Sequence, residues 1–417
     1  MKKGSGPVRE FPLAEEVRKD FLKQRKAGLP DFSNTALTFR HLSDARLLGT
    51  RRLFRLMGNP LLTSLLGKLG VRAVDWSLPG AKWMVKNTVY KQFVGGTDFA
   101  DAQEAIAQLA SRGVDSILDY GAEGLHTPAG MDASMQEVLR ATEFCARNAA
   151  AIGSVVKLSG LIRFNVLESY NDKVIDFDRV TDKELKDGLD RLNRICQLAH
   201  DRGTEIYLDA EESWIQSTID QIAEHMMARY NRKQHVVFTT CQLYRHDRLT
   251  YLRALHRRSR EQGFKLALKI VRGAYMVKEN KRAETFGLRT PIQSTLQDTH
   301  DDFNEAAAYC LEHHEEVACC VASHNEESVT RHITRMVELG IPPDHPNVRF
   351  SQLLGMSDNL TFNLAEAGYN VSKYMVYGPV HEVLPYLVRR AQENTSVTGE
   401  AGRELRMLDE EVARRGL

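Results

Sequence analysis

The chain has 417 residues, a formal net charge of +1, 42% hydrophobic residues and 27% charged residues. This composition excludes a globally disordered chain, and a net charge near zero gives no indication of nucleic acid as a partner. The longest uncharged run, 56–67, is far shorter than the ~20 apolar residues of a membrane-spanning helix. The six cysteines show no C-x-x-C spacing, and no apolar segment of a signal peptide follows Met1. The composition therefore predicts a globular protein of a reducing, cytoplasmic-type compartment.

Residues 1–90 show no alternation of strands and are predicted to form an N-terminal helical region. Leucines between positions 53 and 69 lie among basic residues, a pattern typical of short helices. We favour packing of these helices against the core. Contact of a basic amphipathic surface with a membrane is the alternative.

From Gly113 onward, short apolar runs alternate with segments of helical period, one of which follows a predicted capping box, Thr181-x-x-Glu184. Eight strands alternating with helices predict a (β/α)₈ barrel of the TIM type, although doubly wound sheets alternate in the same way. We place the barrel at 91–396 and a C-terminal helical tail at 397–417. The predicted strands are Val114–Tyr120, Ser154–Leu161, Glu205–Ala210, His235–Gln242, Leu266–Gly273, Val317–Ser323, Val348–Leu353 and Val371–Val376.

Polar side chains are dense at the predicted strand ends, where a barrel of this kind carries its chemistry. A single such residue is ordinarily a solvated loop residue or a helix cap, but eight strand ends together indicate a site. The residues are Asp119 with Glu123, Lys157, Asp209 with Glu211, Gln242, Lys269 with Arg272, His324 with Asn325, Gln352, and Tyr374 with Tyr377.

The helix after Gly378-Pro379 places Tyr386, Arg389, Arg390 and Glu393 on one face. Two arginines beside an aromatic ring suit the capture of a carboxylate, whereas Glu393 paired with the arginines at the surface is an equally good interpretation. The chain has no metal-ligand spacing, so no metal is expected, and it has neither a P-loop nor a G-x-G-x-x-G motif.

Two alternative functions follow from these residues. A Schiff-base lyase would use Lys157 or Lys269 as its amine nucleophile. A barrel without catalytic activity would bind an anionic metabolite through Arg389 and Arg390.

Residues 373–394, KYMVYGPVHEVLPYLVRRAQEN, resemble the C-terminal signature of the proline dehydrogenase family. Other segments between Val89 and Asn394 resemble the family in the same order, and they fall on the strand ends above. They are YKQFVGG (90–96), ILDYG (117–121), VKLS (156–159), LDAE (208–211), KIVRGAY (269–275), ASHNE (322–326) and QLLGM (352–356).

The resemblance implies a distorted (β/α)₈ barrel that holds FAD noncovalently and oxidises L-proline to Δ¹-pyrroline-5-carboxylate, the first step of proline catabolism to glutamate. Hydride would pass from substrate C5 to flavin N5, and electrons would pass on to a membrane quinone. The protein would be monofunctional, with a separate pyrroline-5-carboxylate dehydrogenase downstream. We expect it in the cytoplasm at the bacterial inner membrane through peripheral contact, with a mitochondrial location as the alternative.

The resemblance also implies a role for each matching residue. The catalytic set is Lys157, Asp209, Tyr374, Arg389 and Arg390, of which Lys157 and the two arginines would hold the substrate carboxylate. Glu123 would be a gate residue that pairs with Arg389 when the site is empty. The proline ring would lie among Tyr275, Leu353, Tyr374 and Tyr386. The cofactor would contact Asp209, Ala210, Gln242, Lys269, Arg272, Gly273, Ala274, Tyr275, His324, Asn325 and Glu393.

Three positions bear on specificity within this family. Many bacterial members have arginine where Lys269 stands, and their glutamine matches Ser351 and not Gln352. Tyr374 is absent from the related hydroxyproline dehydrogenases, where its bulk would crowd a ring hydroxyl. We therefore expect proline as the substrate, with hydroxyproline as the alternative.

Overall fold

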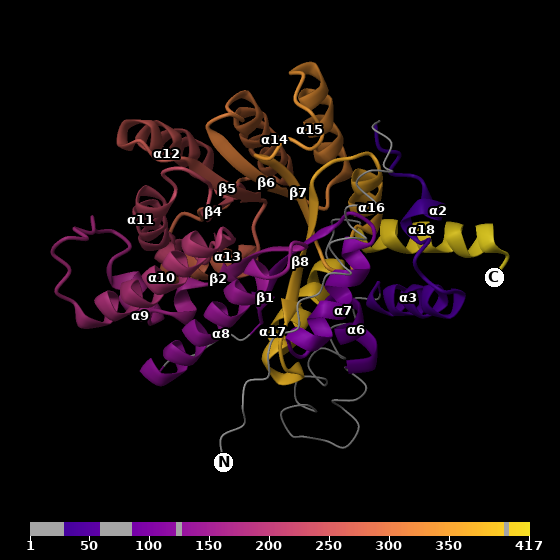
Figure 1. The fold of residues 1–417 in the computed structure, drawn as a ribbon, viewed down its shortest axis with the longest axis horizontal. Coiled ribbons are helices and arrows are strands. Elements are labelled where there is room, and N and C mark those ends of the chain that lie inside the picture. The colour runs from indigo at the N-terminus through magenta and orange to yellow at the C-terminus, as the bar shows by residue number, and fades with distance from the viewer. Residues whose placement is uncertain (1–28, 59–85, 122–126, 396–399) are drawn as a thin grey trace, which may run out of the picture.

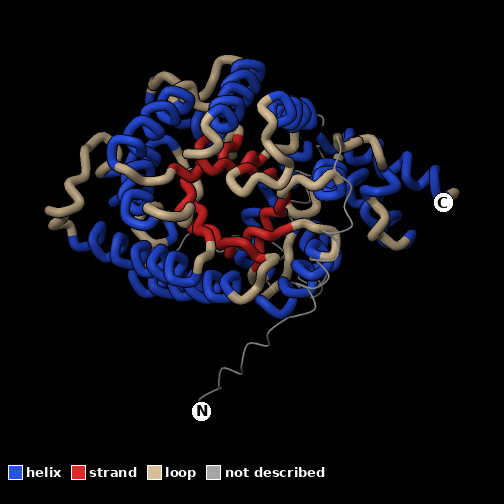
Figure 2. Tube along the Cα trace, turned by 45° about the horizontal axis from the view of Figure 1, so that its top comes forward, coloured by secondary structure: helices blue, strands red, loops and turns tan. Residues whose placement is uncertain are grey.

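The computed structural model describes residues 29–58, 86–121, 127–395 and 400–417, and at 86–87, 391–395 and 400–401 it describes the backbone alone. Eight parallel strands form a closed barrel in sequence order, as the ring of strands in Figure 2 shows. The predicted (β/α)₈ barrel is therefore confirmed. Its strands are β1 (Asp115–Tyr120), β2 (Ala151–Val156), β3 (Glu205–Leu208), β4 (Val237–Gln242), β5 (Leu266–Val271), β6 (Val317–Ala322), β7 (Val348–Leu353) and β8 (Val371–Tyr377).

Helices surround the barrel (Figures 1 and 2), and most of them bury an apolar face in the core around the strands. In α10, for example, Leu185, Leu192 and Cys196 are buried, and Gly203 ends the helix in the left-handed region with φ +69°. The surrounding helices are α7 (Phe99–Ala110), α8 (Pro128–Ala146), α9 (Phe164–Ser169), α10 (Lys183–Arg202), α11 (Ser213–Tyr230), α12 (Arg248–Gln262), α13 (Met276–Phe286), α14 (Leu296–Glu312), α15 (Glu326–Glu338), α16 (Asp358–Glu366) and α17 (Val380–Thr395).

Two local predictions are wrong. The second strand was expected to run to Leu161, but β2 ends at Val156 and a short 3₁₀ turn, η2 (Leu158–Gly160), follows. Leu158 and Leu161 are nevertheless fully buried between barrel and helices, so their apolar character does not mark strand. The N-cap of α10 is Asp182, whose side chain accepts the amide hydrogens of Glu184 and Leu185, in place of the predicted Thr181 capping box.

Aromatic, aliphatic and small side chains fill the barrel interior, among them Ile117, Val155, Tyr207 and Phe238. Below them, Arg349 of β7 donates to the Glu205 carboxylate of β3, which also accepts from the Tyr207 hydroxyl. The interior is thus a packed core that is closed at the amino ends of the strands. The opposite end, formed by the carboxyl ends of the strands, is where this fold generally carries its active site.

A second helical group packs beside the barrel and supports α17. It contains α2 (Thr35–Thr38), α3 (Asp44–Met57), the short π-helical turn η1 (Lys86–Tyr90), α6 (Lys91–Phe93) and α18 (Glu400–Arg415), which Figure 1 shows at the C-terminus beside α3. Phe54, Phe93, Leu387 and Leu408 share one buried cluster there. Of the predicted N-terminal helical region, residues 1–28 and 59–85 lie outside the described residues. No helix in the described ranges is both long and apolar enough to cross a membrane.

Candidate active site

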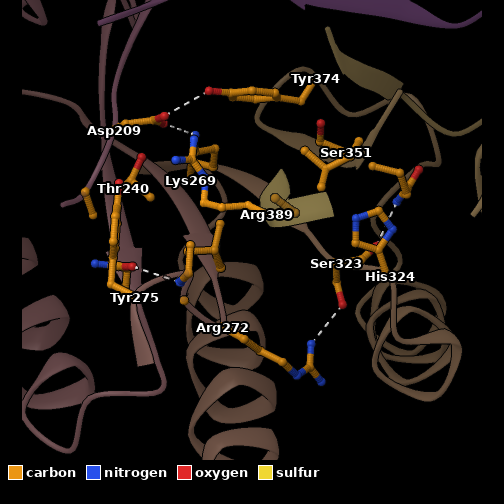
Figure 3. Close-up of a pocket in the computed structure, with 18 of the residues that line it drawn as sticks. Asp209, Thr240, Lys269, Arg272, Tyr275, Ser323, His324, Ser351, Tyr374 and Arg389 are labelled. Atoms are coloured by element: carbon orange, nitrogen blue, oxygen red, sulfur yellow. Dashed lines mark hydrogen bonds and ion pairs between the residues drawn. The ribbon is translucent and has the colours of Figure 1, made fainter. Parts of the chain in front are cut away.

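One cavity of about 340 Å³ lies at the carboxyl ends of the strands, where the ring of polar residues was predicted (Figure 3). It is lined by residues from or shortly after all eight strands, by two residues of α14 and by three residues of α17. The lining residues predicted from sequence are Lys157, Asp209, Ala210, Gln242, Lys269, Arg272, Gly273, Ala274, Tyr275, His324, Asn325, Leu353, Tyr374, Tyr386, Arg389 and Arg390.

The floor of the cavity is a buried charge network. The Lys157 ammonium lies 2.9 Å from the Asp119 carboxylate and 3.6 Å from that of Asp209, and the Lys269 ammonium also donates to Asp209. The Tyr374 hydroxyl lies 2.8 Å from Asp119 and 2.9 Å from Asp209, so it bridges the two carboxylates. Figure 3 shows the Tyr374 hydroxyl and the Lys269 side chain both directed at the Asp209 carboxylate. Two carboxylates and two ammonium groups therefore balance in charge within this network.

The two carboxylates differ in electrostatic environment. Burial alone would raise the pKa of Asp209, but the ammonium groups of Lys269 and Lys157 hold it below its usual value. Burial raises the pKa of Asp119. Lys157 opposes this rise, whereas the neighbouring Asp209 carboxylate adds to it. Although burial lowers the pKa of Lys157, the two carboxylates outweigh that effect and raise it above its ordinary value.

The segment after β5 forms one wall. Arg272 donates to the imidazole of His300 and to the hydroxyls of Ser323 and Ser328, which fix its guanidinium at the edge of the cavity. Gly273 has φ +144°, and an added Cβ would lie 2.4 Å from the ring of Tyr244, so only glycine fits this turn.

The same turn directs backbone toward the cavity. Ala274 donates its amide hydrogen to the Gln242 side chain over 3.3 Å, and Gln242 in turn donates to the carbonyl of Glu211. Both Gly273 and Ala274 are exposed at the cavity. The segment therefore presents backbone groups beside a fixed cation.

The loop after β6 carries His324, whose Nδ1 lies 3.0 Å from the Ser357 hydroxyl. Burial, followed by the nearby Lys373 and Arg390 charges, lowers the pKa of His324 well below its usual value, so its ring is neutral near pH 7. Asn325 accepts the Ser328 amide and is the N-cap of α15, a role that its residue type alone suggested.

The α17 face brings Tyr386, Arg389 and Arg390 to the same cavity that Lys157 and Lys269 line. The Arg390 guanidinium lies 5.3 Å from the ring centroid of Tyr386, within cation–π distance, and Arg390 is 7% exposed. Cations thus approach the cavity both from the strands and from the helix. This arrangement suits a small ligand that carries a carboxylate.

Two predicted residues cannot be placed. Glu123, the expected gate, lies outside the described residues, and the side chain of Glu393 in α17 lies outside the described part of the chain. Two members of the predicted ring lie away from the cavity. Glu211 accepts from the Ser159 amide and hydroxyl, and Tyr377 donates to Glu137 of α8.

Asp119 and Gln352 belong to the predicted ring of strand-end residues and line the cavity, although no specific role was predicted for either. Gln352 lines the cavity, although its amide is occupied by the Ser323 carbonyl and the Thr361 hydroxyl. No pattern in the sequence identifies the remaining lining residues, which are Thr240, Val271, Leu296, His300, Ala322, Ser323 and Ser351.

A family model described as "Proline dehydrogenase" matches residues 102–403. "Proline dehydrogenase 1, mitochondrial" of Dictyostelium discoideum is 32% identical over 376 residues, which cover 80% of this chain and 66% of that protein. "Carbapenem antibiotics biosynthesis protein CarD" of Pectobacterium carotovorum subsp. carotovorum is 29% identical over 337 residues, 81% of this chain and 86% of that protein. The chain spans 34% of "Proline dehydrogenase 1, mitochondrial" of Drosophila melanogaster, to which it is 40% identical over 235 residues.

Solved structures resemble this one in fold. A structure of proline utilization A (PutA) from Bdellovibrio bacteriovorus has a TM-score of 0.70 at 18% identity, and the match covers 92% of this chain and 41% of that chain. The similarity extends beyond the barrel to most of the chain.

Glu211 gives a test of the electrostatics behind the cavity wall. Burial raises its pKa from 4.5 to about 7, so the folded protein retains a proton that the unfolded chain releases. The contribution of Glu211 to stability is therefore present below pH 4.5 and is lost as the pH rises to about 7. We expect Glu211→Gln to gain stability relative to wild type between pH 5 and pH 8, by up to roughly 3 kcal/mol.

Urea unfolding of both proteins at several pH values measures this difference. Glu404, whose pKa is also raised to about 7 by burial, is present in both proteins, so its contribution cancels. Glu261→Gln, which removes an exposed carboxylate from α12, serves as the control and should leave the pH profile as in wild type. If the free energies of unfolding of wild type and Glu211→Gln change in parallel with pH, the pKa of Glu211 is not raised by burial.

Proposed function

Because the chain belongs to the proline dehydrogenase family, we propose that it oxidises L-proline to Δ¹-pyrroline-5-carboxylate with FAD bound at the carboxyl ends of the strands. The observation that carries this proposal is a single cavity with Arg389 and Arg390 on its helix side and Lys157 on its strand side. Three cations there suit a carboxylate, and the tyrosines between them suit a small apolar ring.

The residues of the cavity fit a flavin nucleotide. Thr240 lines the cavity, and its buried hydroxyl has no hydrogen-bond partner in the described part of the chain, so a bound polar group would satisfy it. Arg272 is a fixed cation suited to a diphosphate, and Gly273 and Ala274 offer exposed backbone. The proposed FAD contacts are Asp209, Ala210, Gln242, Lys269, Arg272, Gly273, Ala274, Tyr275, His324, Asn325 and Glu393.

The reaction needs position and charge more than a nucleophile. Loss of hydride from C5 of proline requires an uncharged ring nitrogen, whose lone pair stabilises the developing iminium. When bound, FAD supplies the acceptor for this hydride. Arg389 and Arg390, with Lys157, would fix the substrate carboxylate and so orient C5, an effect that can lower the barrier by several kcal/mol. Lys269, held by Asp209, would place positive charge where negative charge accumulates on reduction.

Tyr374 would set the substrate preference. Its hydroxyl is held by two carboxylates, so its ring is fixed above the floor of the cavity. A fixed ring leaves little room for a hydroxyl on the substrate. We therefore propose proline over hydroxyproline, with Tyr275, Leu353 and Tyr386 as the remaining walls.

The carboxylates beside Lys157 and Lys269 argue against a Schiff-base lyase, because they form ion pairs with both side chains. An amine nucleophile needs a lowered pKa, whereas the neighbouring carboxylates raise the pKa of Lys157. Lys269 is likewise paired with Asp209. Both lysines therefore serve better as fixed charges than as nucleophiles.

For the electron acceptor we propose a membrane quinone, with the protein at the surface of the membrane that holds it and a separate pyrroline-5-carboxylate dehydrogenase taking the product. Met276, Val277 and Leu296 support this proposal, because all three are more than half exposed. Leu296 lines the cavity, and the other two directly follow Tyr275, so apolar surface lies at its rim. Co-sedimentation with lipid vesicles measures this contact.

An anaerobic absorption spectrum of the purified protein tests the proposed function. We expect a flavin spectrum that bleaches on addition of L-proline and much less with hydroxyproline, and that returns when a short-chain ubiquinone is added. A flavin that stays oxidised with proline would refute the substrate. A colourless protein after incubation with FAD, trapped by borohydride with a carbonyl substrate, would favour the lyase. Tight binding of an amino acid without any flavin change would favour the binding protein.

Arg390→Met tests the carboxylate clamp. Loss of a charge-assisted pair should raise KM for proline by about tenfold to a hundredfold, with flavin content unchanged. Steady-state kinetics and the flavin-to-protein absorbance ratio measure the two effects. Arg331→Met, which removes an exposed arginine from α15, is the matched control. An unchanged KM in Arg390→Met would exclude the clamp.

Substitutions of Tyr374 test the specificity argument. Tyr374→Ser removes the ring and should raise the ratio of hydroxyproline to proline turnover, while overall activity falls because two carboxylates lose their shared donor. Tyr374→Phe keeps the ring and should preserve the substrate ratio. The comparison of kcat/KM for both substrates separates bulk from hydrogen bonding. If kcat/KM falls by the same factor for both substrates in Tyr374→Ser, Tyr374 does not select the substrate.

A further inference from the structure

A cluster of histidine and glutamate side chains lies at the amino ends of β6 and β7, at the end of the barrel opposite the cavity. The turn between α14 and β6 contains His313, His314, Glu315 and Glu316, and the turn before β7 contributes His345. The sequence shows no recognisable metal-ligand spacing here, and no metal was expected from it. The fold brings His345, from a turn about thirty residues later in the chain, next to His314 and Glu315.

The ligand atoms of His314, Glu315 and His345 all lie within 4.8 Å of one another. The Glu315 carboxylate is 3.3 Å from Nε2 of His314 and 3.8 Å from Nε2 of His345. Ligands at zinc–nitrogen and zinc–oxygen distances in tetrahedral geometry are about 3.3 Å apart, so small movements bring all three to one ion. Glu315 is exposed and free to adjust, whereas the side chains of His314 and His345 are mostly covered.

The partners of the two imidazoles orient them. Nδ1 of His314 lies 2.9 Å from the Leu311 carbonyl and can donate to it, which leaves the lone pair of Nε2 directed at Glu315. The Asn347 side chain donates to the His314 carbonyl, so the two turns are joined by the protein itself.

The imidazole of His345 must change its tautomer before its Nε2 atom can bind a metal ion. Burial lowers the pKa of His345, and the nearby His314 lowers it further, so the ring is neutral near pH 7. Its Nδ1 accepts a long 3.3 Å hydrogen bond from the Asn347 amide, and binding through Nε2 would exchange that bond for an Nδ1–H. This exchange limits the expected affinity.

We propose that His314, Glu315 and His345 form a binding site for a divalent transition-metal cation of the zinc class, with water at the fourth position. Two imidazoles and one carboxylate are the ligand types that Zn²⁺ accepts. Glu316 is not a further ligand, because it is paired with His256 and Arg260. The site would join the turns before β6 and β7, so binding would stabilise the fold and leave the chemistry at the other end unchanged.

Isothermal titration of the full-length, tag-free protein with ZnCl₂ after chelator treatment tests this proposal. We expect one saturable site with Kd on the order of micromolar, and a melting temperature that rises with zinc concentration. His345→Ala and Glu315→Gln should each weaken binding by at least about tenfold and abolish the rise in melting temperature. Glu315 is 80% exposed, so Glu315→Gln should fold normally, which circular dichroism checks.

The matched control is His200→Ala. His200 is an exposed histidine of α10 with the carboxylate of Asp201 3.4 Å away, but no further ligand of the described residues is grouped with it. This variant should bind zinc as the wild type does. The proposal is overturned if zinc binding does not saturate below about 100 µM, because binding that weak is adventitious. It is also overturned if Glu315→Gln and His345→Ala bind zinc with unchanged affinity.

Discussion

The arrangement of the cavity depends on the buried charge network that joins Asp119, Lys157, Asp209, Lys269 and Tyr374. Removing charges from water is costly, and removing one partner leaves another uncompensated. The network is therefore stable only when all its members meet. They come from β1, β5 and β8 and from the residues just after β2 and β3, so closure of the barrel is the condition for their meeting.

The two sides of the cavity have different structural support. The strand side is fixed by the barrel and by the network. The helix side depends on α17, which packs against α3, α18 and η1 as well as against the barrel mouth. Segments from both ends of the chain thus determine where Arg389 and Arg390 lie, although neither segment belongs to the barrel. Changes in α3 or α18 can therefore affect the site without touching it.

Sequence patterns identified the eight strands and their order because each is a short apolar run with a polar residue at its end. They misplaced the end of β2, because Leu158 and Leu161 are buried by tertiary packing and not by the sheet. They could not identify Thr240 or His300, whose place at the cavity depends on strand register and on the packing of α14. The grouping of His345 with His314 was invisible for the same reason, since it depends on two adjacent turns of the barrel.

Two buried carboxyl groups that hold loops of the site in place reduce the stability of the folded protein. Glu211 accepts hydrogen bonds from the amide and hydroxyl of Ser159, two residues after Lys157. Glu404 of α18 accepts from the amide of Ser357, whose hydroxyl contacts His324. Burial raises the pKa of both carboxyl groups to about 7, so each destabilises the folded state when charged. Ser357 also has φ +48°, a strained conformation for a residue with a side chain. Buried carboxylates and strained backbone of this kind are retained where the position of a loop matters more than its stability. Here the loops concerned are those that carry Lys157 and His324.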